Sequence, residues 1–249
     1  MRLIHIVLSE LVWLGLCQAI DFCEIKACKE VPHIGCHNDM NFNSRCLRTH
    51  FLIKIRPFTE YLIKIHNKYR QNVAAGEIRQ LPTAAHMPEL VWDADLALVA
   101  EYHVKQCQTA LTDYCVATND FEAPKANVGA VFESRIRGYS STNTEYISIF
   151  AEQWLHQVYS ITSGDIHEYV RQEYSHIMTI LNEKVSHFGC AAAQDFNLKH
   201  TRFLLICYYS SAPTLGTIVY TTGNFTPADC ENGPSTDHPN LCKTLPKSA

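Results

Sequence analysis

The sequence lacks an excess of basic residues, a long apolar run beyond its first residues and an internal repeat. Against 25 Asp and Glu residues stand 21 Lys and Arg residues, and the net charge is −4. A basic face for nucleic acid is therefore not indicated. No stretch after residue 19 is long and apolar enough to form a membrane helix. We expect no nucleic-acid partner and no membrane span.

Signatures of catalysis are also missing. A Gly-x-Ser-x-Gly nucleophile elbow does not occur in the chain. A cysteine nucleophile requires a free thiolate, and an even set of crosslinked cysteines offers none. We expect no enzymatic activity and no catalytic residue. A metal-dependent or protease-like hydrolase that uses His176, for example paired with an unplaced serine, stays open as an alternative.

The first residues are typical of a secretory signal peptide. A basic start at Arg2 precedes a mostly apolar stretch from Ile4 to Cys17, and Ala19 is a small residue at the position that signal peptidase prefers. The alternative is a buried first helix. We expect residues 1–19 to be removed and the protein to be secreted into the extracellular space.

Ten of the 11 cysteines follow this segment. They fall into a group of four near the start and three later pairs: Cys23, Cys28, Cys36 and Cys46, then Cys107 with Cys115, Cys190 with Cys207, and Cys230 with Cys242. An even number of cysteines in an exported chain predicts a disulfide framework, although the spacing alone leaves the connectivity open.

Apolar residues at helical spacing predict four helices. The first begins near Thr59, which is placed to cap it, and ends at Gly76; the second begins at Asp93. The third begins at Thr144 and is the clearest of the chain, and a short one covers Tyr174–Leu181.

The last part of the chain has the pattern of an antiparallel meander. Its predicted strands are Phe188–Ala193, Arg202–Tyr209 and Gly216–Thr222, separated by turn residues. Residues 108–143 show no convincing periodicity, and we expect loops there with at most one short strand. Helices first and a sheet last favour an α+β or three-layer α-β-α domain.

Three segments follow the predicted signal peptide. Residues 20–56 form a cysteine-rich N-terminal extension that has no core of its own and depends on crosslinks. Residues 57–225 form the main domain. Residues 226–249 form a tail rich in turn residues, closed by a loop if Cys230 pairs with Cys242.

Four short motifs in order resemble the CAP superfamily, which includes cysteine-rich secretory proteins, antigen 5 of insect venoms and pathogenesis-related class 1 proteins of plants. The resemblance is closest to the insect antigen 5-related branch. The motifs are His66-Asn67-Lys68-Tyr69-Arg70 with Ala75-Gly76, Met87–Cys107 with Trp92-Asp93, His176 fourteen residues before Cys190 in Gly189-Cys190-Ala191, and Cys207-Tyr208-Tyr209 with Gly223-Asn224.

The resemblance implies a fold and a disulfide scheme. The fold is a disulfide-stabilised three-layer α-β-α sandwich with an antiparallel central sheet. The implied pairs are Cys23–Cys36, Cys28–Cys115, Cys46–Cys107 and Cys190–Cys207, which leaves Cys230–Cys242 for the tail. The motif from His66 to Arg70 is expected to be structural, with Arg70 bridging to a neighbour. Tyr208, Tyr209 and Tyr220 are expected in the core.

Many members of this superfamily carry a cleft with two histidines and two acidic residues that can hold zinc. Here only His176 matches. No histidine lies between Cys107 and Cys115, the Gly-Glu-Asn position reads Ala126-Asn127-Val128, and the second acidic position is Gln157. His176 and Gln157 are therefore interpreted as relics of the cleft, and we expect no metal and no cofactor. As an alternative, His156, His167 or His187 supplies the metal ligand that is missing beside His176.

The sequence thus favours a secreted, non-enzymatic and monomeric protein that binds an extracellular protein or a lipid or sterol. A role in seminal fluid, saliva or venom fits the resemblance. A toxin-like channel modulator is a further alternative, which the short cysteine-poor tail disfavours. Asn224-Phe225-Thr226 is an acceptor for N-glycosylation.

Overall fold

The computed structural model describes residues 20–134 and 142–247, so the predicted signal peptide lies outside the described residues. The elements in chain order are β1 (Thr49–Ile53), η1 (Arg56–Phe58), α1 (Thr59–Ala74), β2 (Val91–Trp92), α2 (Ala94–Val104), β3 (Lys125–Ser134), α3 (Asn143–His156), η3 (Gln157–Tyr159), α4 (Ser163–His167), η4 (Gln172–Tyr174), α5 (Ser175–Leu181), β4 (His187–Phe196), β5 (His200–Tyr209) and η5 (Pro227–Asp229).

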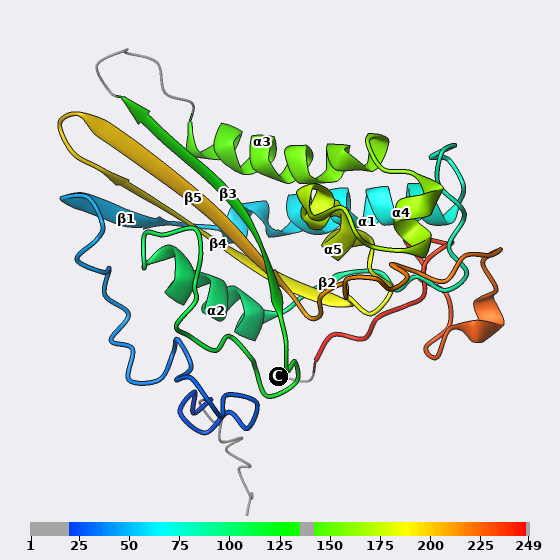
Figure 1. Cartoon of the computed structure of the whole chain (residues 1–249), viewed down its shortest axis with the longest axis horizontal. Helices are drawn as coiled ribbons and strands as arrows, with labels where there is room; N and C mark the ends of the chain where they lie inside the picture. Colours follow the sequence, from blue (N-terminus) through cyan, green and yellow to red (C-terminus); the bar gives the residue numbers. More distant parts are fainter. Residues whose placement is uncertain (1–19, 135–141, 248–249) are drawn as a thin grey trace, which may run out of the picture.

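These elements form three layers around a five-stranded sheet (Figure 1). The strand order is β1-β4-β5-β3, with antiparallel neighbours throughout, and the two-residue β2 adds a short parallel pairing with β4. Helix α2 covers one face, and α1, α3 and α5 cover the other. The predicted three-layer α-β-α fold is confirmed.

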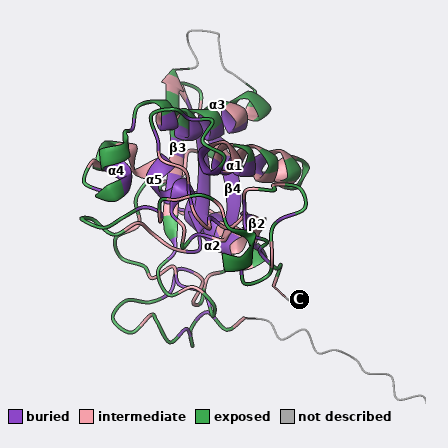
Figure 2. Ribbon diagram, turned by 90° about the vertical axis from the view of Figure 1, so that its right-hand side faces the viewer, coloured by how far each residue is buried: buried purple, intermediate pink, exposed green. Residues whose placement is uncertain are grey.

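The core consists of two apolar clusters, one on each face of the sheet. Alternate residues of β5 point to opposite faces because side chains in a strand have a period of two. Phe203 and Leu205 join the cluster under α1, α3 and α5, whereas Leu204 and Ile206 join the cluster under α2. Both central strands are therefore buried on both faces, as the purple centre of Figure 2 shows.

Helix α1 begins without the predicted side-chain cap. Its N-cap is Phe58 and no side chain caps it, so the prediction for Thr59 is wrong. The turn η1 runs directly into α1, and the Thr59 N–H already donates to the carbonyl of Arg56. The predicted end is confirmed: Gly76 has φ of 75°, and its N–H donates to the Val73 carbonyl at 3.0 Å. Glycine adopts this left-handed conformation without a steric penalty.

Strand β3 is ten residues long, where the sequence predicted loops with at most one short strand. This strand lies at the edge of the sheet and lacks a run of large apolar residues, so its pattern is weak. Gly129 occurs where Phe150 of α3 packs against the strand, since a Cβ at this position would lie 2.3 Å from the Phe150 ring. The small residue therefore lets α3 approach the sheet.

The predicted strand Gly216–Thr222 is wrong, because this segment is irregular. Its polar backbone groups bond outside the sheet: the Val219 N–H donates to the carbonyl of Ile166 at 2.9 Å. Val219 and Tyr220 are nevertheless buried, and the Tyr220 hydroxyl donates to the Pro82 carbonyl at 2.7 Å. Burial of an irregular segment produced the apolar pattern that resembled a strand.

The N-terminal extension packs against the domain as well as being crosslinked to it. Phe22, Ile25 and Ile34 are buried in the cluster under α2, and the Phe22 ring meets Tyr102 of α2 edge-on at 5.5 Å. Strand β1, which lies in this extension, forms one edge of the sheet. The sequence missed β1, β2 and α4, all of which are short.

Five disulfides join the ten cysteines of the described residues. The bonds are Cys23–Cys36, Cys28–Cys115, Cys46–Cys107, Cys190–Cys207 and Cys230–Cys242, the same pairs that the resemblance implied. Two of them tie the extension to the segment that follows α2. Within residues 20–134 and 142–247, no helix is long and apolar enough to cross a membrane.

Arg70 of α1 holds two loops together at the centre of the molecule. Its side chain is fully buried and donates to the carbonyls of Pro88, Ile180, Asn182 and Val185. Burial lowers the pKa of Arg70 to about 9. Arg70 therefore bridges to its neighbours as expected, and its partners are backbone carbonyls. These hydrogen bonds hold the end of α5 and the loop after it against the segment before β2.

Candidate functional site

The residues of the expected cleft come from three elements. Trp154 of α3 and Gln157 of η3 are three residues apart and so lie on one side of the helical segment. They meet His176 at the start of α5, whose ring stacks on the Trp154 indole with centroids 5.6 Å apart and planes 24° apart. The two relics predicted from the sequence, His176 and Gln157, therefore lie side by side.

Gln157 connects η3 to α5 by its amide. Its Oε1 accepts from the Ile177 N–H at 3.2 Å, and its Nε2 lies 3.5 Å from His176 Nδ1 and 3.5 Å from the Glu173 carbonyl oxygen. A carboxylate would offer no donor to the His176 nitrogen or to the carbonyl. The amide thus performs a structural task at the position where the resemblance places an acid.

Burial, with a smaller contribution from the positive charge of Lys125, lowers the pKa of His176. The imidazole is consequently neutral at neutral pH. Within the described ranges its ring contacts are Trp154 and the Gln157 amide, and no carboxylate there bonds it to fix a tautomer for base catalysis or to raise its basicity as a ligand.

Asn127 of β3 bonds the start of α5 from the side of the sheet. It is buried, and its Nδ2 donates to the backbone carbonyl of His176 at 3.2 Å. It also contacts the Tyr209 hydroxyl, which donates to His66 Nε2 at 2.8 Å. His66 Nδ1 in turn donates to the Leu62 carbonyl at 2.7 Å. A continuous series of polar contacts therefore links the backbone of His176 to His66 in the core.

The residues present do not fit a divalent metal at His176. The other candidate histidines are engaged elsewhere: His156 contacts the rings of Tyr69 and Tyr159, His167 Nδ1 lies 2.7 Å from the Ser163 carbonyl, and His187 Nδ1 lies 2.8 Å from the Ser186 hydroxyl. One imidazole beside an amide lacks the set of imidazole and carboxylate ligands that zinc requires.

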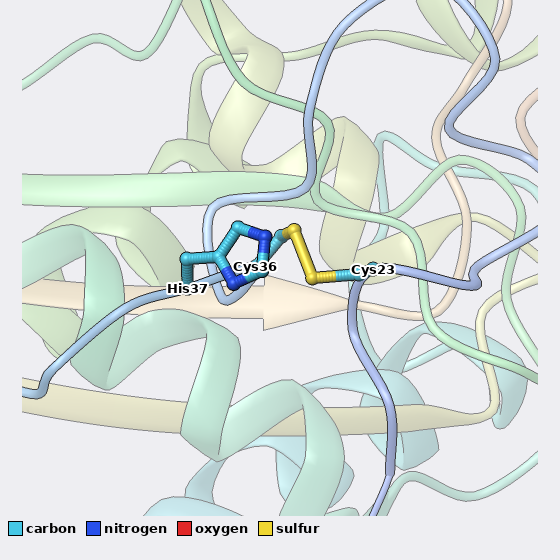
Figure 3. A group of neighbouring side chains, drawn as sticks. All are labelled: Cys23, Cys36 and His37. Carbon is cyan, nitrogen blue, oxygen red and sulfur yellow. A yellow bond between two sulfur atoms is a disulfide. The ribbon is translucent and has the colours of Figure 1, made fainter.

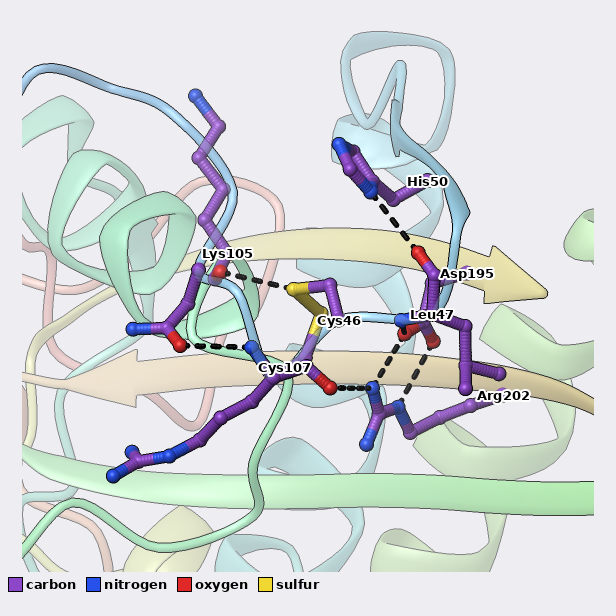
Figure 4. A network of polar contacts seen from close by, with 9 residues as sticks. Cys46, Leu47, His50, Lys105, Cys107, Asp195 and Arg202 are labelled. Atoms are coloured by element: carbon purple, nitrogen blue, oxygen red, sulfur yellow. Dashed lines mark hydrogen bonds and ion pairs between the residues drawn. A yellow bond between two sulfur atoms is a disulfide. The ribbon is translucent and has the colours of Figure 1, made fainter. Parts of the chain in front are cut away.

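Two groups of metal-ligand side chains occur in the described part of the chain, and neither contains His176. Cys23, Cys36 and His37 form an exposed group, drawn in Figure 3. Cys46 and Cys107 lie near Asp195, which pairs with Arg202, as Figure 4 shows. Both groups contain a disulfide, whose sulfur atoms are not thiolates and so are poor ligands.

A second candidate site is an apolar groove between the segment that joins β1 to α1 and helix α2. Its volume is about 1000 Å³. Apolar side chains line most of it, among them Leu52, Ile55, Trp92 and Leu98, and Ala191 of β4 lies at its base. Its charged lining residues are Lys54, Arg56, Glu60 and Glu101, of which Glu101 pairs with Lys105 at 2.7 Å. No sequence pattern predicted this groove, because its lining comes from three distant segments.

The fold and the disulfides define a cysteine-rich α-β-α domain, and comparison with known proteins identifies its family. A model of the cysteine-rich secretory protein family, CAP, matches residues 63–209. The chain belongs to this family, and the predicted insect antigen 5-like branch is confirmed by its relatives.

Among these relatives is Venom allergen-1 of Aedes aegypti, 25% identical over 241 residues that cover 95% of this chain and 92% of the relative. Tabinhibitin 4 of Tabanus yao is 30% identical over 197 residues, covering 77% of this chain and 76% of the relative. The solved structure of BmVAL-1 superimposes with a TM-score of 0.58 at 21% identity, covering 75% of this chain and 94% of that one.

Proposed function

We propose that this protein is secreted and acts by binding an extracellular ligand, without catalysing a reaction. The observation that carries the proposal is the use of the cleft residues as structural ties. Gln157 and Asn127 bond the start of α5, and His176 stacks on Trp154. No hydroxyl among the described residues forms a hydrogen bond with the His176 ring, so a Ser-His pair has no support in the geometry.

The groove beside α2 supports a lipid with an anionic head group as the ligand. Lys54 and Arg56 are exposed at its lip, and neither has an ion-pair partner within the described ranges. Pockets for small molecules are mostly apolar with a few convergent polar groups, in a volume of about 300–1000 Å³. A hydrocarbon chain would lie along Trp92 and Leu98, with its charged end beside the two cations.

The relatives support a place in a secretory fluid. Those named above are a venom allergen and a tabinhibitin, and another is the antigen 5 like allergen Cul n 1 of Culicoides nubeculosus. Saliva, venom and seminal fluid are the fluids in which we propose this protein acts.

Titration with a fluorescent long-chain fatty acid tests the binding proposal. We expect saturable binding that weakens at least tenfold in Lys54→Glu/Arg56→Glu. Lys64→Glu is the matched control, because Lys64 is an exposed lysine of α1 outside the groove. Equal binding by all three proteins, or no binding, would reject the lipid ligand.

Hydrolysis assays with ester and peptide substrates test the absence of catalysis. We expect the same background rate from the natural protein and from His176→Ala. Turnover that disappears in His176→Ala would establish a hydrolase instead. Calorimetric titration with zinc completes the test, since micromolar 1:1 binding abolished by His176→Ala would contradict the proposed loss of the metal site.

A further inference from the structure

The C-terminal tail lies along the segment that precedes α2. The Cys242 N–H donates to the Met87 carbonyl at 2.9 Å, and the Cys242 carbonyl accepts from the Glu89 N–H at 2.8 Å. The Thr244 hydroxyl donates to the Glu89 carbonyl at 2.6 Å. Figure 1 shows this red segment ending beside α2 and the green chain that leads into β3. Beyond Thr244 the chain is more exposed, and Leu245 keeps 53% of its surface accessible.

Lys247 then enters a pocket made by two distant segments. Its Nζ lies 2.7 Å from Asp93 Oδ2 and 2.7 Å from Asp120 Oδ2, with Asp95 Oδ2 at 3.7 Å. It also lies 4.2 Å from the centre of the Phe121 ring. Three carboxylates and an aromatic face around one ammonium group combine ion pairing with a cation–π contact.

The burial of Asp93 makes a cation necessary at this position. Its side chain is only 2% exposed, and its Oδ1 is already used as the N-cap of α2, accepting from the Leu96 N–H at 2.8 Å. Removing the partner of a buried charge is strongly destabilising. His187 also faces the pocket, where burial, its largest influence, lowers its pKa. Lys247 is therefore the group that supplies positive charge to Asp93 among the described residues.

We propose that Asp93, Asp120 and Phe121 form a binding site for a primary ammonium group, and that Lys247 is its internal ligand. A small primary amine takes the place of Lys247 when the tail end lifts. Two observations support this exchange: the side chain of Asp120 is 53% exposed, so one side of the site borders solvent, and Lys247 is the last described residue of the tail. Exposed ends of a chain open locally at a lower free-energy cost than the core does.

Chemical rescue tests the site in the full-length protein. Lys247→Ala removes the internal ligand, and n-butylammonium carries the same ammonium group on a chain one carbon longer than the three carbons that are removed. We expect Lys247→Ala to lower the melting temperature by several degrees. Millimolar n-butylammonium should restore at least half of this loss, whereas equal concentrations of NaCl or n-butanol should not.

Control variants separate the pocket from general effects. Lys243→Ala removes an exposed lysine of the same tail and should neither lower the melting temperature nor create a response to the amine. In Lys247→Ala/Asp120→Asn the rescue should weaken at least tenfold in amine concentration. The unmodified protein should need a higher amine concentration than Lys247→Ala, because Lys247 competes. An unchanged melting temperature in Lys247→Ala, or equal responses to the amine and to NaCl, would overturn the proposal.

Discussion

Three buried histidines should make the stability of this protein steeply dependent on pH between 4 and 6.5. His33, His66 and His103 are 2%, 0% and 2% exposed. In each, burial is the main influence, and it lowers the pKa from the ordinary value of 6.5 to about 4. The unfolded chain therefore binds protons on these rings at a pH where the folded chain does not.

The sign and size follow from this difference in pKa. Above pH 6.5 the rings are neutral in both states and the folded protein has its full stability. This stability is lost as pH falls from 6.5 toward the pKa near 4 of the rings in the folded protein. Between pH 7.5 and pH 5 each imidazole lowers the free energy of unfolding by about 2 kcal/mol, so the three together lower it by about 6 kcal/mol. Near pH 5.25 the unfolded state binds about 3 more protons, which gives a slope of about 4 kcal/mol per pH unit.

Urea denaturation in steps of half a pH unit measures this slope. We expect His103→Gln to reduce it by about one third, because glutamine keeps a polar contact to Tyr208 but does not titrate; His103 Nδ1 lies 3.0 Å from that hydroxyl. His167→Gln replaces an exposed histidine and should leave the slope unchanged. The reasoning would be refuted if the slope in the natural protein corresponded to uptake of less than one proton on unfolding, or if His103→Gln left the slope unchanged.

Four other outcomes are expected. Arg70→Met should destabilise the fold by about 3–5 kcal/mol in urea unfolding, because it leaves buried carbonyls without donors; a loss below 1 kcal/mol would contradict the bridging role. Gln157→Glu should raise the pKa of His176, since a carboxylate then lies near its Nδ1, and ¹H NMR titration checks this; an unchanged or lower value would count against the geometry. Asn224 is exposed, so amidase treatment of the native protein should reduce its mass, and Asn224→Gln should show no such shift. Peptide mapping without reduction should recover the five disulfides, and any free thiol would contradict the scheme.

The strongly periodic elements could be predicted from the sequence because local spacing decides them. Helix α3 has a continuous apolar stripe, and Thr142 with Glu145 forms its capping box one turn before the stripe begins. The weak edge strand β3 was missed, and the buried segment at Gly216–Thr222 was mistaken for a strand. In both cases the outcome depends on which neighbour the backbone meets, which no local pattern reports.

The candidate site could likewise be predicted only in part from the sequence. The loss of the acidic cleft residues was readable at Gln157 and at Asn127, because each is a change of residue type at a recognisable motif position. The hydrogen bonds that these amides form could not be predicted, since their partners at Ile177 and His176 lie far away in the sequence. The structure alone shows that both residues bond the start of α5.

The sequence by itself determined the family and the layered fold, and it predicted the loss of the acidic cleft, because motifs, helical spacing and residue types are local properties. Tertiary structure decided how the groove beside α2 is lined and which carboxylates surround Lys247. Asp93, Asp120 and Lys247 are separated by long stretches of chain, and only the packing of the tail on the segment before α2 brings the two carboxylates within 2.7 Å of one ammonium group.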